Sequence, residues 1–396
     1  MWLVSIKDGF YYGKTVGDRL KKLLALLALV FCCLMILQAP RAYALEIEAT
    51  SAILIDADSG RVLFEQNAHQ SLPVASLTKI LTALLTLEHF DDLHQTFTLP
   101  ADFKNVGESS INLAPGETLT IEDLLYALML RSANDAAQAL AIAVAGSESA
   151  FADLMNQRTT ELGLTESHWV NPHGLHDDAH YSSAYDLACI TRTAMRIPMF
   201  NTLISTRTHT IPWAGQEDDR VVSNHNSLLT QYEGADGVKT GYTSKAGNCL
   251  VGSATRDGLR LIGVVLNCED TYGQMKVLLD YGFDHYELRQ VAAFGDTAAR
   301  IPVVAGRADS VNVIYGDNVR LLLPKGEEYT LEPTLDLPER LVTPVDSQVV
   351  VGQALFSDGA GNVTKADLYP ADDLESFTLW GLVRTAFTRI LQVLLV

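Results

Sequence analysis

The sequence has few cysteines, and an odd number of them can form part of a mature fold. Five occur among 396 residues, and Cys32 and Cys33 lie in an apolar N-terminal run. The remaining three, Cys189, Cys249 and Cys268, exclude a disulfide framework. Cys249 and Cys268 flank a predicted hairpin turn and could lie near each other. We expect two buried, unbonded thiols, with a bond between them as the alternative.

Positive charge is also scarce. The chain has 29 Lys and Arg residues against 48 Asp and Glu residues, a formal net charge of −19. Without residues 1–44 these counts are 23 and 46, and the net charge is −23. A nucleic-acid partner requires a basic face for the phosphates, so the composition excludes this class of partner.

A hydrophobic run long enough to cross a bilayer is missing. The most apolar N-terminal segment, 23–37, is short for a membrane span. It follows a basic segment at 19–22 and precedes the small-x-small sequence Ala42-Tyr43-Ala44, which is the three-part pattern of a secretory signal. We predict that residues 1–44 are a signal peptide cleaved after Ala44, with an uncleaved N-terminal anchor as the alternative. Both versions predict an exported protein.

The spacing of a zinc peptidase is absent, because no His-Glu-x-x-His sequence occurs. Three histidines, His173, His176 and His180, lie close together in a segment that Pro and Gly interrupt. Their spacing does not match a zinc site, and we interpret them as surface or supporting histidines. We expect no metal and no cofactor.

The sequence has a high apolar content, 48%, and its apolar residues recur with the spacing of helices and strands. Alternating residues around Asp58-Ser59-Gly60 predict a hairpin, and a helix should begin near Ser76. Thr120 and Asp123 have the spacing of a helix cap. The other expected elements are a helical stretch at 120–145, a loop at 171–183 and strands at 247–254 and 259–267.

Beyond residue 290 the composition changes to short β-like runs separated by Gly, Asp and Pro. The segment 377–396 is apolar with one polar stripe that includes Arg384 and Arg389. Arginine is costly at the centre of a bilayer, so we predict a helix lying in the membrane interface, with a final helix packed on the protein as the alternative. The expected organisation is a signal peptide at 1–44, a larger mixed α and β domain at 45–287, a small all-β domain at 288–372 and an amphipathic membrane-associating helix at 373–396.

Three short motifs carry the chemistry: Ser76-Leu77-Thr78-Lys79, Ser132-Ala133-Asn134 and Lys239-Thr240-Gly241. Three residues apart at a helix start, Ser76 and Lys79 lie on one helical face. A serine hydroxyl is a weak nucleophile unless a neighbour takes its proton. A lysine can do so only if burial and nearby positive charge favour its neutral form, and Lys239 could supply that charge.

The motifs differ in specificity. Ser-x-x-Lys and Lys-Thr-Gly each occur once, whereas Ser-x-Asn occurs three times, the other copies being Ser110-Ile111-Asn112 and Ser310-Val311-Asn312. We choose Ser132 because it follows one strongly helical stretch and precedes another. The order of the motifs and their structural context carry the assignment.

The segment 73–82 resembles the active-site segment of penicillin-binding proteins and serine β-lactamases. More narrowly, residues 45–287 resemble the low-molecular-weight D-alanyl-D-alanine carboxypeptidases. Other stretches that carry this resemblance are Asn171-Pro-His-Gly-Leu, His180-Tyr-Ser-Ser-Ala-Tyr-Asp, Asn224-His-Asn-Ser-Leu-Leu and Gly237-Val-Lys-Thr-Gly-Tyr-Thr-Ser-Lys-Ala-Gly. It implies an α/β (α+β) serine DD-peptidase or β-lactamase-like domain, an antiparallel sheet flanked by helices, followed by a small all-β domain.

The resemblance also implies catalytic roles. Ser76 is the acylated nucleophile, Lys79 its proton acceptor, and Ser132 the relay that passes the proton to the leaving D-alanine. The implied substrate is the peptidoglycan stem peptide, and β-lactams are the implied covalent inhibitors. The implied place is the outer face of the cytoplasmic membrane.

The implied binding residues surround these three. Asn134 holds the substrate peptide and the lysine, while Lys239 and Thr240 bind the terminal carboxylate. Gly241 leaves room for substrate beside its strand. The backbone amides of Ser76 and Tyr242 form the oxyanion hole.

Two other functions fit parts of the pattern. A serine β-lactamase uses the same motifs, but no Glu-x-x-x-Asn segment lies between the second and third motifs to activate a deacylating water. A catalytically silent wall-binding protein could keep the fold. Such a protein has no need of Ser76, Lys79 and Lys239 together.

Overall fold

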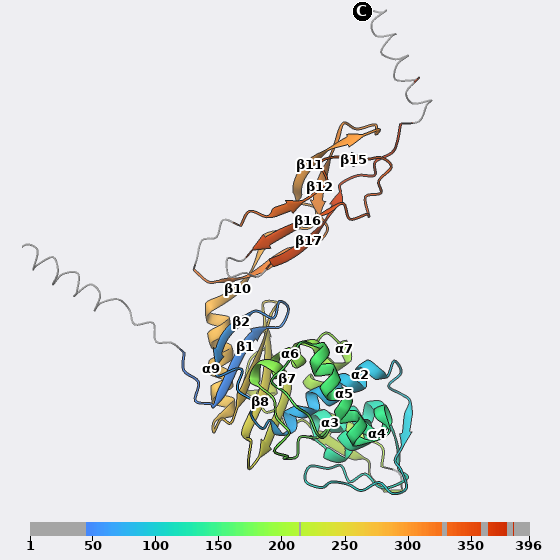
Figure 1. Cartoon of the computed structure of the whole chain (residues 1–396), viewed down its shortest axis with the longest axis vertical. Coiled ribbons are helices and arrows are strands. Elements are labelled where there is room, and N and C mark those ends of the chain that lie inside the picture. The colour runs from blue at the N-terminus through green and yellow to red at the C-terminus, as the bar shows by residue number, and fades with distance from the viewer. Residues whose placement is uncertain (1–44, 214, 327–330, 358–362, 378–382, 384–396) are drawn as a thin grey trace, which may run out of the picture. The chain divides into compact units, whose positions relative to one another are not determined.

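The computed structural model describes residues 45–213, 215–326, 331–357, 363–377 and 383 (Figure 1). The predicted signal peptide lies outside these residues, and so do residues 378–382 and 384–396 of the C-terminal helix predicted over 373–396. The first residues of that range are described and are not helical, because Leu374 and Ser376 form β-bridges with Val345 and Gly306. Among the residues described, no helix has the length and apolar character to cross a membrane.

A five-stranded antiparallel sheet is the centre of the larger domain (Figure 1). In spatial order its strands are β2 (Val62–Gln66), β1 (Ser51–Asp56), β9 (Leu259–Leu266), β8 (Gly247–Arg256) and β7 (Ala235–Thr243). The hairpin expected over 50–66 is confirmed as β1 and β2, and the two strands expected near 250 and 260 are confirmed as β8 and β9. β7 is an edge strand, and within the described part of the chain no strand pairs with its outer side.

Helices cover both faces of this sheet. Side chains alternate along a strand, so neighbours in β1 point to opposite faces. Ile53 and Ile55 belong to the core shared with the helical cluster. Leu54 lies on the other face, under α9 (Thr271–His285), where a Cβ on Gly282 would be 2.7 Å from the Leu54 side chain. Glycine at 282 therefore permits the close approach of helix and sheet.

The helical cluster is built around η1 (Ala75–Thr78) and α2 (Lys79–His89). Leu77, Ile80 and Leu81 are fully buried, which places this segment in the middle of the domain. The surrounding helices are α3 (Ile121–Leu130), α4 (Asn134–Ala145), α5 (Glu148–Glu161), α6 (Ala184–Ala194) and α7 (Pro198–Ser205), whereas the short α8 (Leu228–Gln231) packs against β7. The short hairpins β3 (Thr96–Thr98) with β4 (Thr118–Thr120) and β5 (Thr208–Ile211) with β6 (Arg220–Ser223) complete the cluster.

The helical stretch expected over 120–145 is two helices. Thr120 caps α3 by accepting a hydrogen bond from the Asp123 amide at 3.0 Å, as its spacing indicates. The chain then breaks at Ser132, whose φ of +60° is outside the helical region. α4 begins directly afterwards at Asn134, so the break brings two polar side chains to the ends of two buried helices.

The C-terminal part is all β, as the composition predicts. β10 (Tyr286–Ala292) pairs with β13 (Val319–Pro324). A six-stranded sheet has the order β14 (Thr334–Asp336), β16 (Gly352–Ser357), β17 (Val363–Pro370), β12 (Ser310–Tyr315), β11 (Thr297–Val304) and β15 (Leu341–Val342). Its core includes Val313, Leu323, Phe356 and Leu368. The expected fold class, a helix-flanked antiparallel sheet followed by a small all-β domain, is confirmed.

Candidate functional site

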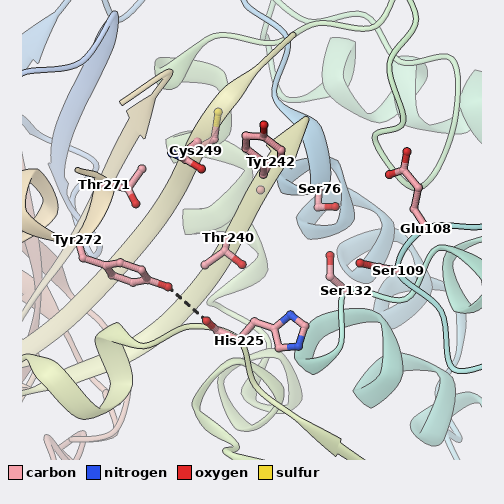
Figure 2. A pocket seen from close by; sticks show the side chains of 12 residues that line it. Ser76, Glu108, Ser109, Ser132, His225, Thr240, Tyr242, Cys249, Thr271 and Tyr272 are labelled. Atoms are coloured by element: carbon pink, nitrogen blue, oxygen red, sulfur yellow. Dashed lines mark hydrogen bonds between the residues drawn. The ribbon is translucent and has the colours of Figure 1, made fainter. Parts of the chain in front are cut away.

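The fold brings the three motifs to one cavity of about 400 Å³ (Figure 2). Its lining residues are Ser76, Glu108, Ser109, Ser132, His225, Thr240, Gly241, Tyr242, Asn248, Cys249, Thr271 and Tyr272. Ser76 comes from η1, Ser132 from the break between α3 and α4, and the residues at 240–242 from the edge strand β7. Lys79 and Lys239 are buried behind this surface.

Lys79 is the centre of the site. Its Nζ lies 2.9 Å from Ser76 Oγ, 2.8 Å from Asn134 Oδ1 and 2.6 Å from the carbonyl oxygen of His173. The last two atoms can only accept hydrogen bonds. A neutral amine has two N–H donors, which these acceptors take, and one lone pair, which remains for the Ser76 hydroxyl proton.

The surroundings favour that neutral form. Burial lowers the pKa of Lys79 well below its ordinary value, and the positive charge of Lys239 lowers it further. The carboxylates of Glu108 and Asp135 act in the opposite direction with smaller effect. The electrostatic contribution expected of Lys239 is therefore present, but burial is the larger cause.

Lys239 is also buried, and its Nζ donates a 3.0 Å hydrogen bond to the carbonyl oxygen of Thr240. Burial lowers its pKa to about 7. A substrate carboxylate beside this amine would favour the charged form and reverse part of that shift. Lys239 and Thr240 can thus bind an anion at one end of the cavity.

Gly241 lies against the backbone of the nucleophile segment. A Cβ at this position would be 3.1 Å from the amide nitrogen of Ser76 and 3.1 Å from the carbonyl oxygen of Val74. The glycine therefore lets β7 approach the Ser76 amide itself, which is a different close contact from the substrate contact expected for it. Ser76 and Tyr242, on either side of this approach, both line the cavity.

Two residues of the site have left-handed backbone conformations that side chains rarely adopt. Ala75, next to the nucleophile, has φ of +49°, and Ser132 has φ of +60°. Such conformations persist only where surrounding contacts enforce them, and they are common at functional sites. Here they aim Ser76 and Ser132 into the same cavity.

The Ser-x-Asn sequence at 110–112 has a different role. Ser110 Oγ donates to the buried carboxylate of Asp135, and Asn112 has φ of +59° in the same loop. Asp135 also accepts the amide of Leu113 at 2.9 Å. Ser110 is therefore part of the loop's own support, whereas Ser132 and Asn134 face Ser76 and Lys79.

Several lining residues have no counterpart in the motifs. Glu108 and Ser109 come from the loop before α3, and the amide of Asn134 donates to the Ser109 carbonyl at 2.7 Å. On the opposite wall, Tyr272 donates a 3.2 Å hydrogen bond to the carbonyl oxygen of His225 (Figure 2). The sequence gives no signal for Glu108, because a lone glutamate in a loop is ordinary solvated charge.

The loop at 171–183 contributes through its backbone. The His173 carbonyl accepts from Lys79, and the His173 side chain lies 3.4 Å from a carboxylate oxygen of Glu148. Burial lowers the pKa of His173. His173 and His180 are both buried, so they are supporting histidines and not surface ones.

These histidines do not gather around a common point for an ion. Within the described ranges, no group of three or more His, Cys, Asp or Glu side chains is arranged to hold a metal. Cys189, Cys249 and Cys268 are free thiols, and burial raises the pKa of both Cys249 and Cys268 to about 11. They are unbonded, as expected from the sequence.

Family models match both domains. The peptidase S11 model, described as D-alanyl-D-alanine carboxypeptidase, matches residues 37–270. A model described as penicillin-binding protein 5, C-terminal domain, matches residues 286–376. The two matches follow the division into a helix-flanked sheet and an all-β part.

Individual proteins are similar to this chain over most of its length. The D-alanyl-D-alanine carboxypeptidase DacA of Escherichia coli (strain K12) is 32% identical over 354 residues, which cover 85% of this chain and 86% of that protein. DacF of Bacillus subtilis (strain 168), named in the same way, is 30% identical over 338 residues, 83% of this chain and 86% of that protein. The crystal structure of a peptidoglycan synthesis regulatory factor, PBP3, from Streptococcus pneumoniae has a TM-score of 0.75 and 27% identity, covering 84% of this chain and all of that chain.

Proposed function

Because the chain belongs to the D-alanyl-D-alanine carboxypeptidase family of peptidase S11, we propose that its Ser76 site removes the terminal D-alanine from peptidoglycan pentapeptide stems. It is a serine-type D-Ala-D-Ala carboxypeptidase and a penicillin-binding protein. The residue assignment rests on the contact of Lys79 Nζ with Ser76 Oγ at 2.9 Å. The other two atoms that contact this amine, Asn134 Oδ1 and the His173 carbonyl oxygen, can only accept hydrogen bonds.

The proposed reaction starts with proton transfer. Ser76 Oγ attacks the carbonyl carbon of the penultimate D-alanine while its proton moves to the lone pair of Lys79. The carbonyl oxygen becomes an oxyanion, which the backbone N–H groups of Ser76 and Tyr242 stabilise. Asn134 holds both the lysine and the substrate peptide.

Collapse of this intermediate breaks the scissile C–N bond. The leaving amine takes a proton from Lys79 through the hydroxyl of Ser132, and free D-alanine departs. Lys239 and Thr240 hold the carboxylate of that D-alanine until it leaves. Water then attacks the Ser76 ester and releases the shortened stem. A β-lactam has a carboxylate and a strained amide in similar positions, so it acylates Ser76 in the same way.

The same proposal places the enzyme outside the cytoplasm. The pattern at 1–44 supports export, and the polar stripe of 377–396 supports a helix lying on the outer face of the cytoplasmic membrane. The net charge of −23 on the remainder of the chain suits a solvated exported domain.

Incubation of a defined pentapeptide muropeptide with the purified protein tests the reaction. The proposal predicts release of one D-alanine per stem and a tetrapeptide product, with none from the Ser76→Ala variant. Cleavage of cross-links without release of D-alanine would instead show an endopeptidase. Rapid turnover of penicillin without a lasting acyl-enzyme would favour the β-lactamase alternative.

A further inference from the structure

Ser76 lines the cavity, and its backbone amide shares a peptide plane with the carbonyl of Ala75. The peptide unit is rigid and planar, and in its trans form the C=O and N–H bonds point in opposite directions. Whatever fixes the direction of the Ala75 carbonyl therefore fixes the direction of the Ser76 N–H. As an early residue of a helical turn, Ser76 has an amide that needs no acceptor within the turn.

A chain of hydrogen bonds fixes the direction of the Ala75 carbonyl. Thr78 Oγ1 donates to the Ala75 carbonyl oxygen at 2.7 Å, and His180 Nε2 lies 2.8 Å from the same Thr78 oxygen. The amide of Val170 donates to His180 Nδ1 at 3.2 Å. Thr78 and His180 are buried, with exposed fractions of 0% and 3%.

The directions of these bonds define one tautomer. The Thr78 hydroxyl has a single proton, which goes to the Ala75 carbonyl, so it must accept from His180. His180 Nδ1 accepts from a backbone N–H and carries no proton. The imidazole is thus neutral with its proton on Nε2, and burial lowers its pKa to about 3, which keeps it neutral at physiological pH.

The same carbonyl is also fixed by packing. Gly174, with φ of +85°, passes so near that an added Cβ would lie 1.9 Å from the Ala75 carbonyl oxygen and 2.8 Å from Thr78 Oγ1. Trp169 packs edge-on against the His180 ring, with centroids 5.3 Å apart. These contacts enforce the left-handed conformation of Ala75, whose φ is +49°.

We propose that His180 and Thr78 are positioning residues that aim the Ser76 N–H at the substrate oxyanion by holding the Ala75 carbonyl. The relay His180 to Thr78 to Ala75 also polarises the shared peptide unit, because hydrogen bonds in a chain strengthen one another. This inference rests on the proposed function, in which the Ser76 amide is an oxyanion donor. Neither side chain touches substrate.

The test compares buried threonines of the same region. Thr78→Val keeps the shape but removes the relay, and Thr86→Val is the matched control, since Thr86 is also buried and bonds only a carbonyl within its own helix. Stopped-flow acylation with a fluorescent penicillin separates noncovalent binding from the acylation rate constant. Loss of one oxyanion donor costs about 100- to 1000-fold in rate, so we expect misdirection of this donor to slow acylation by about 10- to 100-fold. Binding before acylation should change by less than about threefold, because binding does not use the oxyanion contact.

Three further measurements separate positioning from simple loss of stability. Thr78→Ser restores the hydroxyl and should recover acylation to within about threefold of wild type. A peptide boronic acid, which forms a tetrahedral adduct with Ser76, should bind Thr78→Val more weakly by the same factor as the loss in rate. His180→Phe should slow acylation similarly, and the Thr78→Val/His180→Phe pair should be little slower than either variant, because both break one chain.

The outcomes are distinct from those that test the carboxypeptidase itself. The carboxypeptidase proposal is tested by acylation of the wild-type protein at Ser76, and that result does not depend on these variants. The relay is refuted if Thr78→Val acylates as fast as Thr86→Val, or if its whole loss lies in noncovalent binding. Should Thr78→Val not fold, Thr78→Ala provides the same comparison, with folding checked by near-UV circular dichroism.

Discussion

The amine of Lys79 lies 2.9 Å from the hydroxyl of Ser76, and it is fully buried. Burial and the charge of Lys239 lower its pKa well below the ordinary value. A proton acceptor for Ser76 must be neutral, and a lowered pKa increases the neutral fraction of the amine at any given pH. The direction of the change in acylation expected for Lys79→Arg and Glu108→Gln follows from this pair.

Lys79→Arg should be nearly inert. A guanidinium remains protonated in proteins, so it cannot accept the Ser76 proton even if it fits the space. We expect acylation by penicillin to fall by about 1,000- to 10,000-fold, the upper part of the range for loss of a general base. Lys239→Arg should lose less, because its role requires only positive charge. Equal acylation rates for wild type and Lys79→Arg, measured with a fluorescent penicillin, would refute the proton-acceptor role.

Glu108 should tune the pH dependence. Acylation should rise with pH as Lys79 loses its proton, with a midpoint at the lysine pKa. The carboxylate of Glu108 raises that pKa, so Glu108→Gln lowers it and should move the acidic limb of the acylation profile to lower pH. Asp153→Asn, at an exposed position on α5, is the matched control and should leave the profile in place. A limb that moves to higher pH in Glu108→Gln would contradict the account.

A buried ion pair supports the loop next to the site. Arg220 donates to both carboxylate oxygens of Glu117, at 2.6 and 3.0 Å, and the side chains are 5% and 8% exposed. Arg220→Met leaves a buried carboxylate without its partner, which should lower the free energy of unfolding by about 3–5 kcal/mol. Urea unfolding measures this change.

A double variant separates the cost of an unpaired buried charge from the cost of changed packing. Arg220→Met with Glu117→Leu removes both charges, and the double variant should regain most of the lost stability. If the double variant is less stable than Arg220→Met, the added cost lies in replacing Glu117, whose carboxylate also accepts a hydrogen bond from the Ala114 backbone amide at 3.0 Å.

The predicted tail anchor can be removed without disturbing the β domain. Leu374 pairs with Val345, and the Phe377 amide donates to the Ala305 carbonyl at 3.0 Å, so a truncation should follow Phe377. We expect the truncated protein to be released from the membrane fraction and to retain near-normal activity on small peptides, because the site residues lie far upstream. The full-length protein, fractionated in parallel, should remain bound and be only partly released by salt. A truncated protein that stays in the membrane pellet would place the anchor elsewhere, such as in an uncleaved N-terminal segment.

The sequence predicts the parts of the site that depend on local spacing. Ser76 and Lys79 are one helical turn apart, and the turn residues Arg256-Asp257-Gly258 indicate the hairpin of β8 and β9 that pairs with β7. It does not predict the His173 carbonyl as the acceptor for Lys79, because a backbone atom has no residue signature. The same is true of His180, whose contact with Thr78 joins segments 102 positions apart. Such contacts depend on how the loop at 171–183 packs on η1, which periodicity does not describe.

Gly241 illustrates the same limit. The Lys-Thr-Gly motif indicates a strand position at which a side chain would obstruct a close neighbour. From the sequence, the expected neighbour is the substrate. The structure adds the Ser76 amide and the Val74 carbonyl, each 3.1 Å from the position of a missing Cβ. The requirement for glycine was predictable, whereas the identity of this neighbour depended on the tertiary packing of β7 against η1.

The most direct test of the central claim is the position of the acyl group. Labelled penicillin incubated with the purified protein, followed by proteolysis and mass spectrometry, should modify one peptide, with the added mass on Ser76. Ser76→Ala should take up no label while keeping the wild-type circular dichroism spectrum. Label on Ser110 or Ser132, or undiminished labelling of Ser76→Ala, would contradict the account.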